Sequence, residues 1–352
     1  MSITYPISLP TSPGFKRFVM RARSTAAISV SPFTLQQQVY QHQGEIWEAE
    51  CTLPPMVRAD AEAWIASLLS LRGRWGTFVL GDPAGKTPRG TALGNPAVDS
   101  EPQAGTSVAT LAWNASQTGA LKVGDYSQIA KNYLVWPRHF DNAVWAKGEC
   151  TITATDIMAP NGDAEADRAT PTGGATDAAI YQATTAMASV ANQTFTGSIW
   201  LKAATSTIAL QLVLRNQAGA IIVNQNSTIT TSWQHFNLTG TMGSADTEVR
   251  FYVGSAGSWT EAKGAVDLWG GCVYSPAQNA RLHKNLGLDR DSDSNGRIIL
   301  DIFPRLREAP PDFSAILTTS PVGLFRLAEN VTEWDLDEVK NFGMGFKVIE
   351  AI

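Results

Sequence analysis

The segment DRDSDSNGRIILDIFPRLR, residues 289–307, begins with acidic residues at alternate positions. Counted from Asp291, it has oxygen-bearing side chains at positions one, three and five and a glycine at six, as a calcium-binding EF-hand loop has. Position twelve is Ile302, however, where a bidentate Glu belongs. The residues after Gly296 alternate as a strand does, and Asn295 with Gly296 is a two-residue hairpin signal. We therefore predict a solvated acidic turn between two strands rather than a metal site.

A second set of chemically useful side chains lies in the alternating runs SIWLKA, ALQLVLRNQ and EVRFYVGS. Neighbouring side chains of a strand point to opposite faces, so each run has an apolar inner face and a mixed outer face, on which Val213 is also expected. An outer aromatic ring can stack on the C–H face of a pyranose, while amide and guanidinium groups bind its hydroxyls. The alternative is that the outer tryptophan is covered by a loop or by another domain. If these strands share one sheet, the predicted carbohydrate-binding residues are Trp200, Gln211, Arg215, Arg250 and Tyr252, with Trp259 closing one end.

The sequence gives little support for a catalytic function. Its four histidines, at 42, 139, 235 and 283, form no HExxH motif, and neither a GxSxG elbow nor a P-loop is present. A glycosidase pair of carboxylates can be far apart in sequence, so this alternative stays open. Carboxylates are scarce in the region of the alternating runs, however, and we predict no enzymatic activity.

Length and composition favour a globular chain of two domains. The 352 residues are 44% hydrophobic and 17% charged, with a formal net charge of -5 and no run of Lys or Arg, which argues against a nucleic-acid partner. No stretch is long and apolar enough for a membrane span, and the N-terminus lacks a signal-peptide pattern, so we expect a soluble protein folded in a cytoplasm. The three cysteines, 51, 150 and 272, are far apart and form no CxxC pair, which predicts reduced, buried thiols.

The elements that position these residues follow from periodicity. Residues 26–55 alternate as a β-hairpin does, and residues 56–73 have a helical apolar stripe, with Asp60 as the predicted N-cap and Gly73 as the predicted end. From about 132 to 275 the chain is poor in Lys and Glu, and its short alternating runs are typical of a jelly-roll β-sandwich. After this region the sequence again has the character of the first part of the chain. We therefore predict a discontinuous domain, 1–130 plus 280–352, interrupted at a loop tip by a domain of residues 131–279. The stripe comprises Ala61, Trp64, Ile65, Leu68 and Leu71.

The outer segments resemble a tail-hub protein of long-tailed bacteriophages, of the distal tail or minor tail protein kind. The stretches that carry this resemblance include FTLQQQVYQHQGEIWEAECTLPPM, WGTFVLGDP, QTGALKVGDYSQI, IILDIFPRLREAPP, GLFRLAE and GFKVIEAI. The resemblance implies a mainly β fold: a tail-tube-like β-sandwich with one flanking helix, interrupted by the jelly-roll insertion. It also implies a ring, six-fold by analogy to the family, which closes the tail tube. The alternating strands at Ala26–Thr52 fit subunit contacts in such a ring, unless they pair internally.

The insertion resembles the jelly-roll carbohydrate-binding modules that are often grafted onto phage tail proteins. NYLVWPRHFDNAVWAKGECTITATDIMAPNGDAEADRAT, FTGSIWLKA and DLWGGCVY carry the resemblance. Tyr133 interrupts the usual Asn-Leu-Leu start, and the triplet 138–140 replaces the usual Ser-x-x-Phe, so the sugar specificity does not carry over. The resemblance implies that Asp267 or Asp163 is the candidate ligand of a structural calcium. No other cofactor is expected.

Together these resemblances predict a structural virion protein at the phage tail tip or baseplate, assembled in the cytoplasm of a bacterial host. The expected partners are further copies of the chain in a hexamer, the tail tube protein, the baseplate hub, and tail fibre or receptor-binding proteins. The insertion would add host attachment through surface polysaccharide. Two alternatives stay open: the insertion is only a docking or spacer domain, or the chain is a stand-alone carbohydrate-binding protein.

Overall fold

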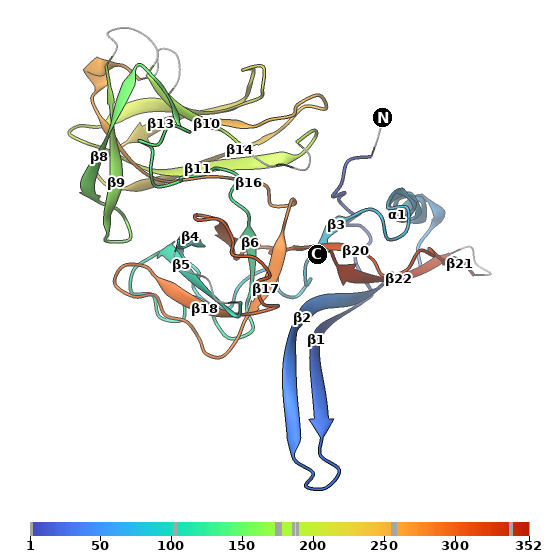
Figure 1. Ribbon diagram of the computed structural model, residues 1–352. Coiled ribbons are helices and arrows are strands. Elements are labelled where there is room, and N and C mark those ends of the chain that lie inside the picture. The colour runs from blue at the N-terminus through green and yellow to red at the C-terminus, as the bar shows by residue number, and fades with distance from the viewer. Residues whose placement is uncertain are drawn as a thin grey trace.

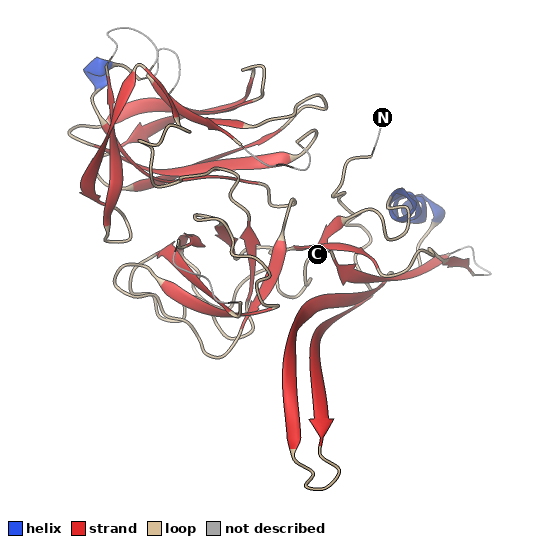
Figure 2. Ribbon diagram, viewed as in Figure 1, coloured by secondary structure: helices blue, strands red, loops and turns tan. Residues whose placement is uncertain are grey.

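The computed structural model describes residues 3–100, 105–172, 178–184, 187, 190–254, 259–337 and 341–351, with the backbone alone for 155 and 156. Strands make up most of its regular structure, and the described residues contain one α-helix and one short 3-10 helix, η1 (Glu261–Lys263) (Figure 2). The prediction of a mainly β chain with one helix is confirmed. Within the described part of the chain, no helix has the length and apolarity that a membrane crossing requires.

The outer segments form a six-stranded antiparallel sheet and, beside it, a closed barrel (Figure 1). The sheet has the order β1-β2-β22-β20-β3, with β21 paired to β22. Its strands are β1 (Arg17–Val30), β2 (Gln37–Thr52), β22 (Phe342–Glu350), β20 (Gly323–Leu327), β3 (Phe78–Leu80) and β21 (Trp334–Leu336). The sheet thus joins the first and last strands of the chain, which makes the outer segments one packed unit despite the long insertion between them.

The helix α1 (Arg58–Ser70) covers this sheet with the predicted apolar stripe, since all five stripe residues are buried. Asp60 is not the N-cap, however. Val57 is the N-cap, and Asp60 lies in the first helical turn, where a carboxylate complements the helix dipole. The helix begins early because a two-way backbone bridge between Met56 and Phe342 ends the extended chain at that point. Gly73 has φ +67° and lies just past the helix end.

The predicted hairpin of residues 26–55 is confirmed, and β1 begins earlier than expected. The half near the body is anchored, because β2 also pairs with β22 and alternates buried with half-buried residues up to Thr52. The distal half projects from the body as a two-stranded arm (Figure 1), and its residues 24–30 and 37–43 are exposed on both faces. At its tip Phe33 is 95% exposed and Leu35 76%. We call residues 24–43 the hairpin arm.

The barrel was not anticipated from the sequence. Six strands close in the order β17-β18-β5-β4-β19-β6 around an apolar core of aliphatic side chains and Trp113. Its strands are β17 (Arg281–Asn285), β18 (Ile298–Phe303), β5 (Ser107–Trp113), β4 (Gly94–Val98), β19 (Ala315–Leu317) and β6 (Tyr126–Ala130). Three strands come from before the insertion and three from after it. Closure therefore depends on pairing between segments far apart in the chain, which local periodicity does not reveal.

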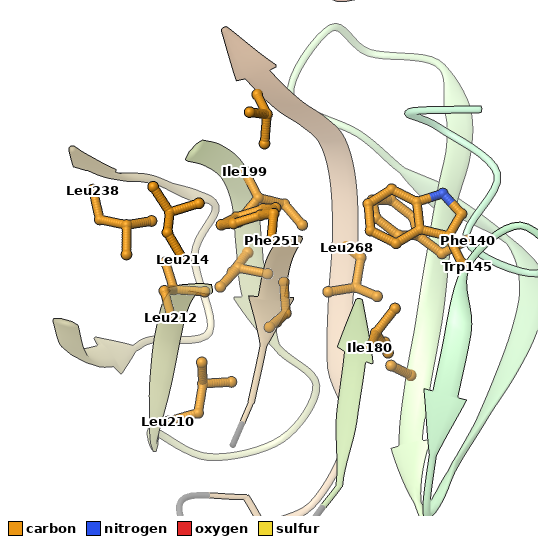
Figure 3. Close-up of a cluster of buried hydrophobic side chains, with 14 of the residues drawn as sticks. Phe140, Trp145, Ile180, Ile199, Leu210, Leu212, Leu214, Leu238, Phe251 and Leu268 are labelled. Atoms are coloured by element: carbon orange, nitrogen blue, oxygen red, sulfur yellow. The ribbon is translucent and has the colours of Figure 1, made fainter. Parts of the chain in front are cut away.

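Residues 146–274 form two facing five-stranded sheets, the expected sandwich (Figure 1). The first has the order β13 (Ile221–Ile229), β12 (Ile208–Arg215), β15 (Arg250–Val253), β10 (Ala179–Ala183) and β7 (Ala146–Gly148). The second has the order β14 (Gln234–Thr241), β11 (Thr194–Ala203), β16 (Val266–Tyr274), β9 (Ala164–Pro171) and β8 (Cys150–Met158). Figure 3 shows the inward side chains of both sheets meeting in one apolar core, as the alternation of SIWLKA, ALQLVLRNQ and EVRFYVGS predicts.

The chain passes from the barrel into the sandwich and back again at two neighbouring barrel strands. It departs from the end of β6 and returns at the start of β17, and these two strands are paired, with Ile129 opposite Arg281. An insertion whose ends are adjacent replaces a turn without opening the barrel. The buried side chain of Asn132 fastens this junction, because its amide donates to the carbonyls of Gly271 and Asp312, both at 3.1 Å.

The acidic segment of residues 289–297 forms a turn, as predicted, with Gly296 at φ +69° and its N–H bonded to the Asp293 carbonyl. The strands on either side, β17 and β18, pair as an antiparallel hairpin, but the two-residue connection that Asn295 and Gly296 indicate is wrong, since residues 286–297 form a longer loop. Asp289 and Asp291 hold that loop against the barrel by accepting backbone N–H groups of residues 119–123, at 2.8 and 2.6 Å. The alternating carboxylates thus act as hydrogen-bond acceptors for backbone.

The three thiols are free and buried, as expected. Burial raises the pKa of Cys150 to about 11 and that of Cys51 to about 12, so both groups are protonated thiols at neutral pH. They pack as small apolar side chains.

Candidate ligand-binding face

A stack of three planar side chains lies on the outer face of the first sandwich sheet. Tyr252 of β15 and Tyr181 of β10 are direct neighbours in the strand register, and their rings are stacked at 4.3 Å with an angle of 12°. The guanidinium carbon of Arg215, from β12, lies 4.9 Å from the centroid of the Tyr252 ring. The Tyr252 ring thus contacts two neighbours, the ring of Tyr181 and the guanidinium cation of Arg215. The order of strands β12, β15 and β10 places the three side chains on one face, where Arg215, opposite Arg250 in the register, reaches the Tyr252 ring diagonally.

The free side of this stack lies beyond Tyr181. On that side, the residue opposite Tyr181 is Ala146 of the edge strand β7. A methyl group leaves room over the Tyr181 ring, whereas a larger side chain would cover it. Tyr181 therefore presents one ring face that no large neighbour in the register fills. An aromatic face of this kind stacks on apolar C–H surfaces such as that of a pyranose.

Polar groups surround the stack. The Gln211 amide of β12 donates to the Asn226 amide oxygen of β13 at 3.1 Å, and both residues belong to the same face. Arg250, next to Arg215 in the register, forms a close ion pair with Glu248. Burial, followed by the neighbouring Tyr181, raises the pKa of Tyr252, so its hydroxyl stays a neutral donor at neutral pH. The combination offers donors and acceptors beside an aromatic platform.

Four predicted site residues therefore share one face: Gln211, Arg215, Arg250 and Tyr252. Val213 lies in the same row but is fully buried, which corrects the expectation of an outer position open to ligand. It is a small side chain directly opposite the much larger Tyr252, and its neighbours along β12 are also long. We call residues 181, 211, 215, 226, 250 and 252 the tyrosine face.

Trp200 is not part of this face, because β11 belongs to the second sheet. Its half-buried ring lies near His235 and Trp269 and packs against the cluster that joins sandwich and barrel. The assumption that all these strands share one sheet is wrong for β11. Alternation correctly placed Trp200 outside the sandwich core, but it does not tell which of two sheets a strand joins.

Trp259 is also placed elsewhere. It is fully buried in the sandwich core, and its indole N–H donates to the Gly264 carbonyl at 3.0 Å. A side chain in this position has no surface for a ligand. The sequence AGSWTEAKG resembles an exposed loop, yet the tryptophan supplies the apolar area that closes one end of the core.

Sequence reasoning missed Tyr181, Asn226 and Ala146. Tyr181 stands in the short run AIYQA, where alternation with the buried Ile180 and Gln182 assigns it to the outer face. That signal was available from the sequence. Its pairing with Tyr252, much later in the chain, was not available, because strand order is a tertiary property.

The two calcium candidates are engaged in ion pairs. Asp267 is fully buried and accepts from Arg168 at 2.7 Å, with Lys202 at 3.5 Å. Asp163 forms a close ion pair with Arg297. Over the part of the chain that the structure describes, no group of three or more His, Cys, Asp or Glu could hold a metal ion. Cationic side chains thus balance the carboxylates that the calcium prediction invoked.

No protein-family model and no curated protein matches the chain. Solved structures similar to part of it include the enzymatically active domain of tailspike protein 4 from bacteriophage CBA120, at 14% identity and TM-score 0.32 over 41% of this chain. That match spans about a fifth of the tailspike domain, 21%. Another is the CBM22-1 xylan-binding domain of Xyn10C from Paenibacillus barcinonensis, at 18% identity and TM-score 0.31, covering 44% of this chain and 97% of that one. Similarities at this level assign no function or ligand to the chain.

Proposed function

We propose that the protein is a structural component of a phage tail tip, a distal tail protein, whose inserted domain of residues 131–279 binds glycans of the host cell surface. The observation that carries the glycan assignment is the Arg215–Tyr252–Tyr181 stack with the small Ala146 beside its open end. The stack holds the Tyr181 ring in place before any ligand arrives, so little side-chain entropy is lost on binding. Amide and guanidinium groups around it are suited to hydroxyl pairs.

The glycan assignment is tested by applying the full-length chain to an array of bacterial surface polysaccharides. We expect binding by the wild type, and at least a tenfold loss of affinity in Tyr181→Ala, because that variant removes the stacking surface. Tyr252→Ala should lose less, since its ring supports Tyr181 from behind. Wild-type chain that binds no polysaccharide of a verified host, together with unchanged adsorption of phage carrying Tyr181→Ala, would favour the docking or spacer alternative instead.

A blocking substitution gives a sharper prediction. Ala146→Phe adds a ring beside Tyr181 and removes no polar group, so we expect glycan binding to fall at least tenfold while the unfolding transition stays in place. Ala209→Phe is the matched control, because Ala209 is exposed on the same sheet in β12 and lies outside the stack. Isothermal titration of both variants with the best array ligand measures the difference. Equal affinities in the two variants would contradict a ligand position over Tyr181.

The tail-tip assignment is supported by the hairpin arm, which exposes apolar side chains that the chain itself does not cover. Besides Phe33 and Leu35, Ile28 is 62% exposed, Val39 59% and Tyr40 67%. A two-stranded ribbon with both faces in solvent gains little from its own fold. We propose that the arm packs on a neighbouring copy of the chain in a closed ring, six-fold by analogy with the family, and that the tail tube, baseplate hub and receptor-binding proteins attach to that ring.

This assembly model predicts separate effects on folding and on association. Phe33→Ser should leave the free energy of unfolding within about 0.5 kcal/mol of the wild type, because the ring is almost fully exposed. The same variant should shift any ring toward the monomer in sedimentation velocity at matched concentrations. Val331→Ser, an exposed apolar residue outside the arm, serves as the control. If rings form equally well in both variants, the hairpin arm does not make the contact between subunits.

We assign no catalytic activity. The carboxylates of Asp99, Glu165 and Asp312 lie around one buried cation, and all three pair with Arg138. A general acid and a nucleophile need carboxylates that face a substrate, whereas these face a fixed cation. A hydrolysis assay on the glycan that binds most tightly tests this point, and release of reducing ends would overturn it.

A further inference from the structure

A cleft of about 260 Å³ lies between the second sandwich sheet and the barrel. Strands β11, β14 and β16 form one wall, with Trp200, His235 and Asn237 among its lining residues. The barrel strands β4 and β19 and the chain just after β19 form the other wall, including Asn95 and Thr318. The cleft is on the sheet opposite the tyrosine face, so the two sites share no side chain.

Trp200 faces this cleft through the regular alternation of β11, and a β-bulge lies beside it in β16. The register between β11 and β16 shifts after Ser198, so that two glycines, 270 and 271, stand opposite one residue of β11. Gly270 adopts φ +69°, the left-handed conformation that glycine allows at such bulges. The half-buried indole of Trp200 is held from the side by His235, at 5.1 Å between ring centroids, and by Trp269 at 6.2 Å.

The lining of the cleft mixes polar and apolar groups and carries no formal charge. None of the described residues that line it is Asp, Glu, Lys or Arg. Burial lowers the pKa of His235 to about 4, so at neutral pH its imidazole is uncharged and offers one donor and one acceptor. Asn95 and Asn237, on opposite walls, are both exposed residues. A ligand entering the cleft can therefore reach an amide from either side.

The volume of the cleft and the chemistry of its lining together limit the class of ligand that it can bind. An uncharged lining disfavours phosphate, carboxylate or ammonium groups, whose desolvation it could not offset. An indole face beside two amides, a neutral imidazole and hydroxyls suits a molecule with one apolar face and several hydroxyls. The volume is smaller than most drug-sized pockets, which run from about 300 to 1,000 Å³. It has space for about one sugar ring and not for a long chain.

We propose that this cleft is a second carbohydrate site, which takes a single neutral pyranose residue against Trp200. The site depends on both the sandwich and the barrel, because neither wall alone encloses the ligand. It is independent of the tyrosine face, and each can exist without the other. The protein would then bind a glycan chain on the tyrosine face independently of a monosaccharide unit in the cleft between the sandwich and the barrel.

The test uses the full-length chain and ligand-observed saturation-transfer NMR with the methyl glycosides of glucose, galactose, mannose and N-acetylglucosamine. Ala146→Phe blocks the tyrosine face in all samples. In that background we expect saturation of at least one glycoside, and at least a tenfold weaker apparent affinity after Asn237→Trp, which fills the cleft from an exposed position on β14. Asn224→Trp, also exposed but on β13 of the other sheet, is the matched control and should change nothing.

The outcomes separate the two sites. Saturation that survives Ala146→Phe and disappears in Asn237→Trp supports the cleft, whatever the polysaccharide array shows. Saturation in the wild type that is lost in Ala146→Phe assigns the sugar to the tyrosine face and overturns the cleft proposal. Failure of all four glycosides to receive saturation in the Ala146→Phe background, or equal saturation in Asn237→Trp and Asn224→Trp, also overturns it. Unfolding curves of each variant show that the comparison is made between folded proteins.

Discussion

Replacing Arg138 with alanine is expected to lower the free energy of unfolding by about 3–5 kcal/mol, the usual cost of leaving buried charges without their partner. Arg138 belongs to the inserted segment and is only 6% exposed. Its guanidinium lies 2.8 Å from carboxylates of Asp99 and Asp312 of the outer segments and 3.0 Å from Glu165 of the sandwich. It also lies 5.0 Å from the centroid of the Phe313 ring. One cation thus joins the two units of the fold.

The loss in Arg138→Ala should depend on pH in a defined direction. Burial raises the pKa of Asp312, and hydrogen bonding and charge from Arg138 oppose that rise. Without the guanidinium the Asp312 pKa rises further. A carboxyl whose pKa is raised in the folded state binds more protons when folded than when unfolded, so stability falls as pH rises from the unfolded pKa through the folded pKa. The variant should therefore be closer to wild type at pH 5 than at pH 8.

Urea unfolding at both pH values measures this effect. Arg58→Ala is the control, because the Arg58–Glu62 pair on α1 is exposed and such pairs contribute little. A deficit in Arg138→Ala that is the same at pH 5 and pH 8, or no larger than that of Arg58→Ala, would contradict the assigned role. Limited proteolysis adds a second readout, since a weakened interface should make the chain near residues 131 and 279 easier to cleave.

Gly270→Ala is expected to destabilise the protein by roughly 2–5 kcal/mol for two separate reasons. A left-handed backbone costs a non-glycine residue about 1–2 kcal/mol, and overpacking of a filled site costs about 1–3 kcal/mol. Gly270 has φ +69°, and a Cβ there would overlap the ring of Phe313. Phe313 in turn packs edge-on against Trp269 at 4.7 Å. The added methyl would push sandwich and barrel apart where they meet.

Gly219→Ala separates the two causes. Gly219 also has a positive φ, +81°, yet a Cβ there would meet nothing within 4 Å. It should therefore show the backbone cost alone. The excess loss in Gly270→Ala, measured by denaturant unfolding, then reports the contact with Phe313, and the double variant with Phe313→Leu should recover part of it. Equal losses in the two glycine variants would show that the interface absorbs the methyl group without strain.

Local pattern was sufficient for much of the secondary structure. The apolar stripe of α1 is buried as predicted, and the inward faces of β11, β12 and β15 meet in the sandwich core. The hairpin was also evident from alternation and turn residues. In each case the evidence lies within one element, because burial of one face imposes a period of 2 or 3.6 on the sequence itself.

The ends of the secondary-structure elements and the roles of the site residues were harder to predict from the sequence. Asp60 has the chemistry of an N-cap, but a bridge between Met56 and a strand near the C-terminus starts the helix earlier. Asp289 and Asp291 belong to a run with the spacing of a calcium site, yet both accept backbone N–H groups of the distant segment 119–123. Such competition between nearby and distant partners is decided only when the chain has folded.

The sequence by itself determined which side chains leave the core, since alternation is a property of each strand. It placed Gln211, Arg215, Arg250 and Tyr252 outside the sandwich, and the structure joins them on one sheet. Only the tertiary structure decided which strands are neighbours. That order brought Tyr181 against Tyr252 and sent Trp200 to the opposite sheet, where the barrel completes a cleft around it. The physical reason is that strand pairing and barrel closure join segments far apart in sequence, and their free energy depends on contacts that no local period encodes.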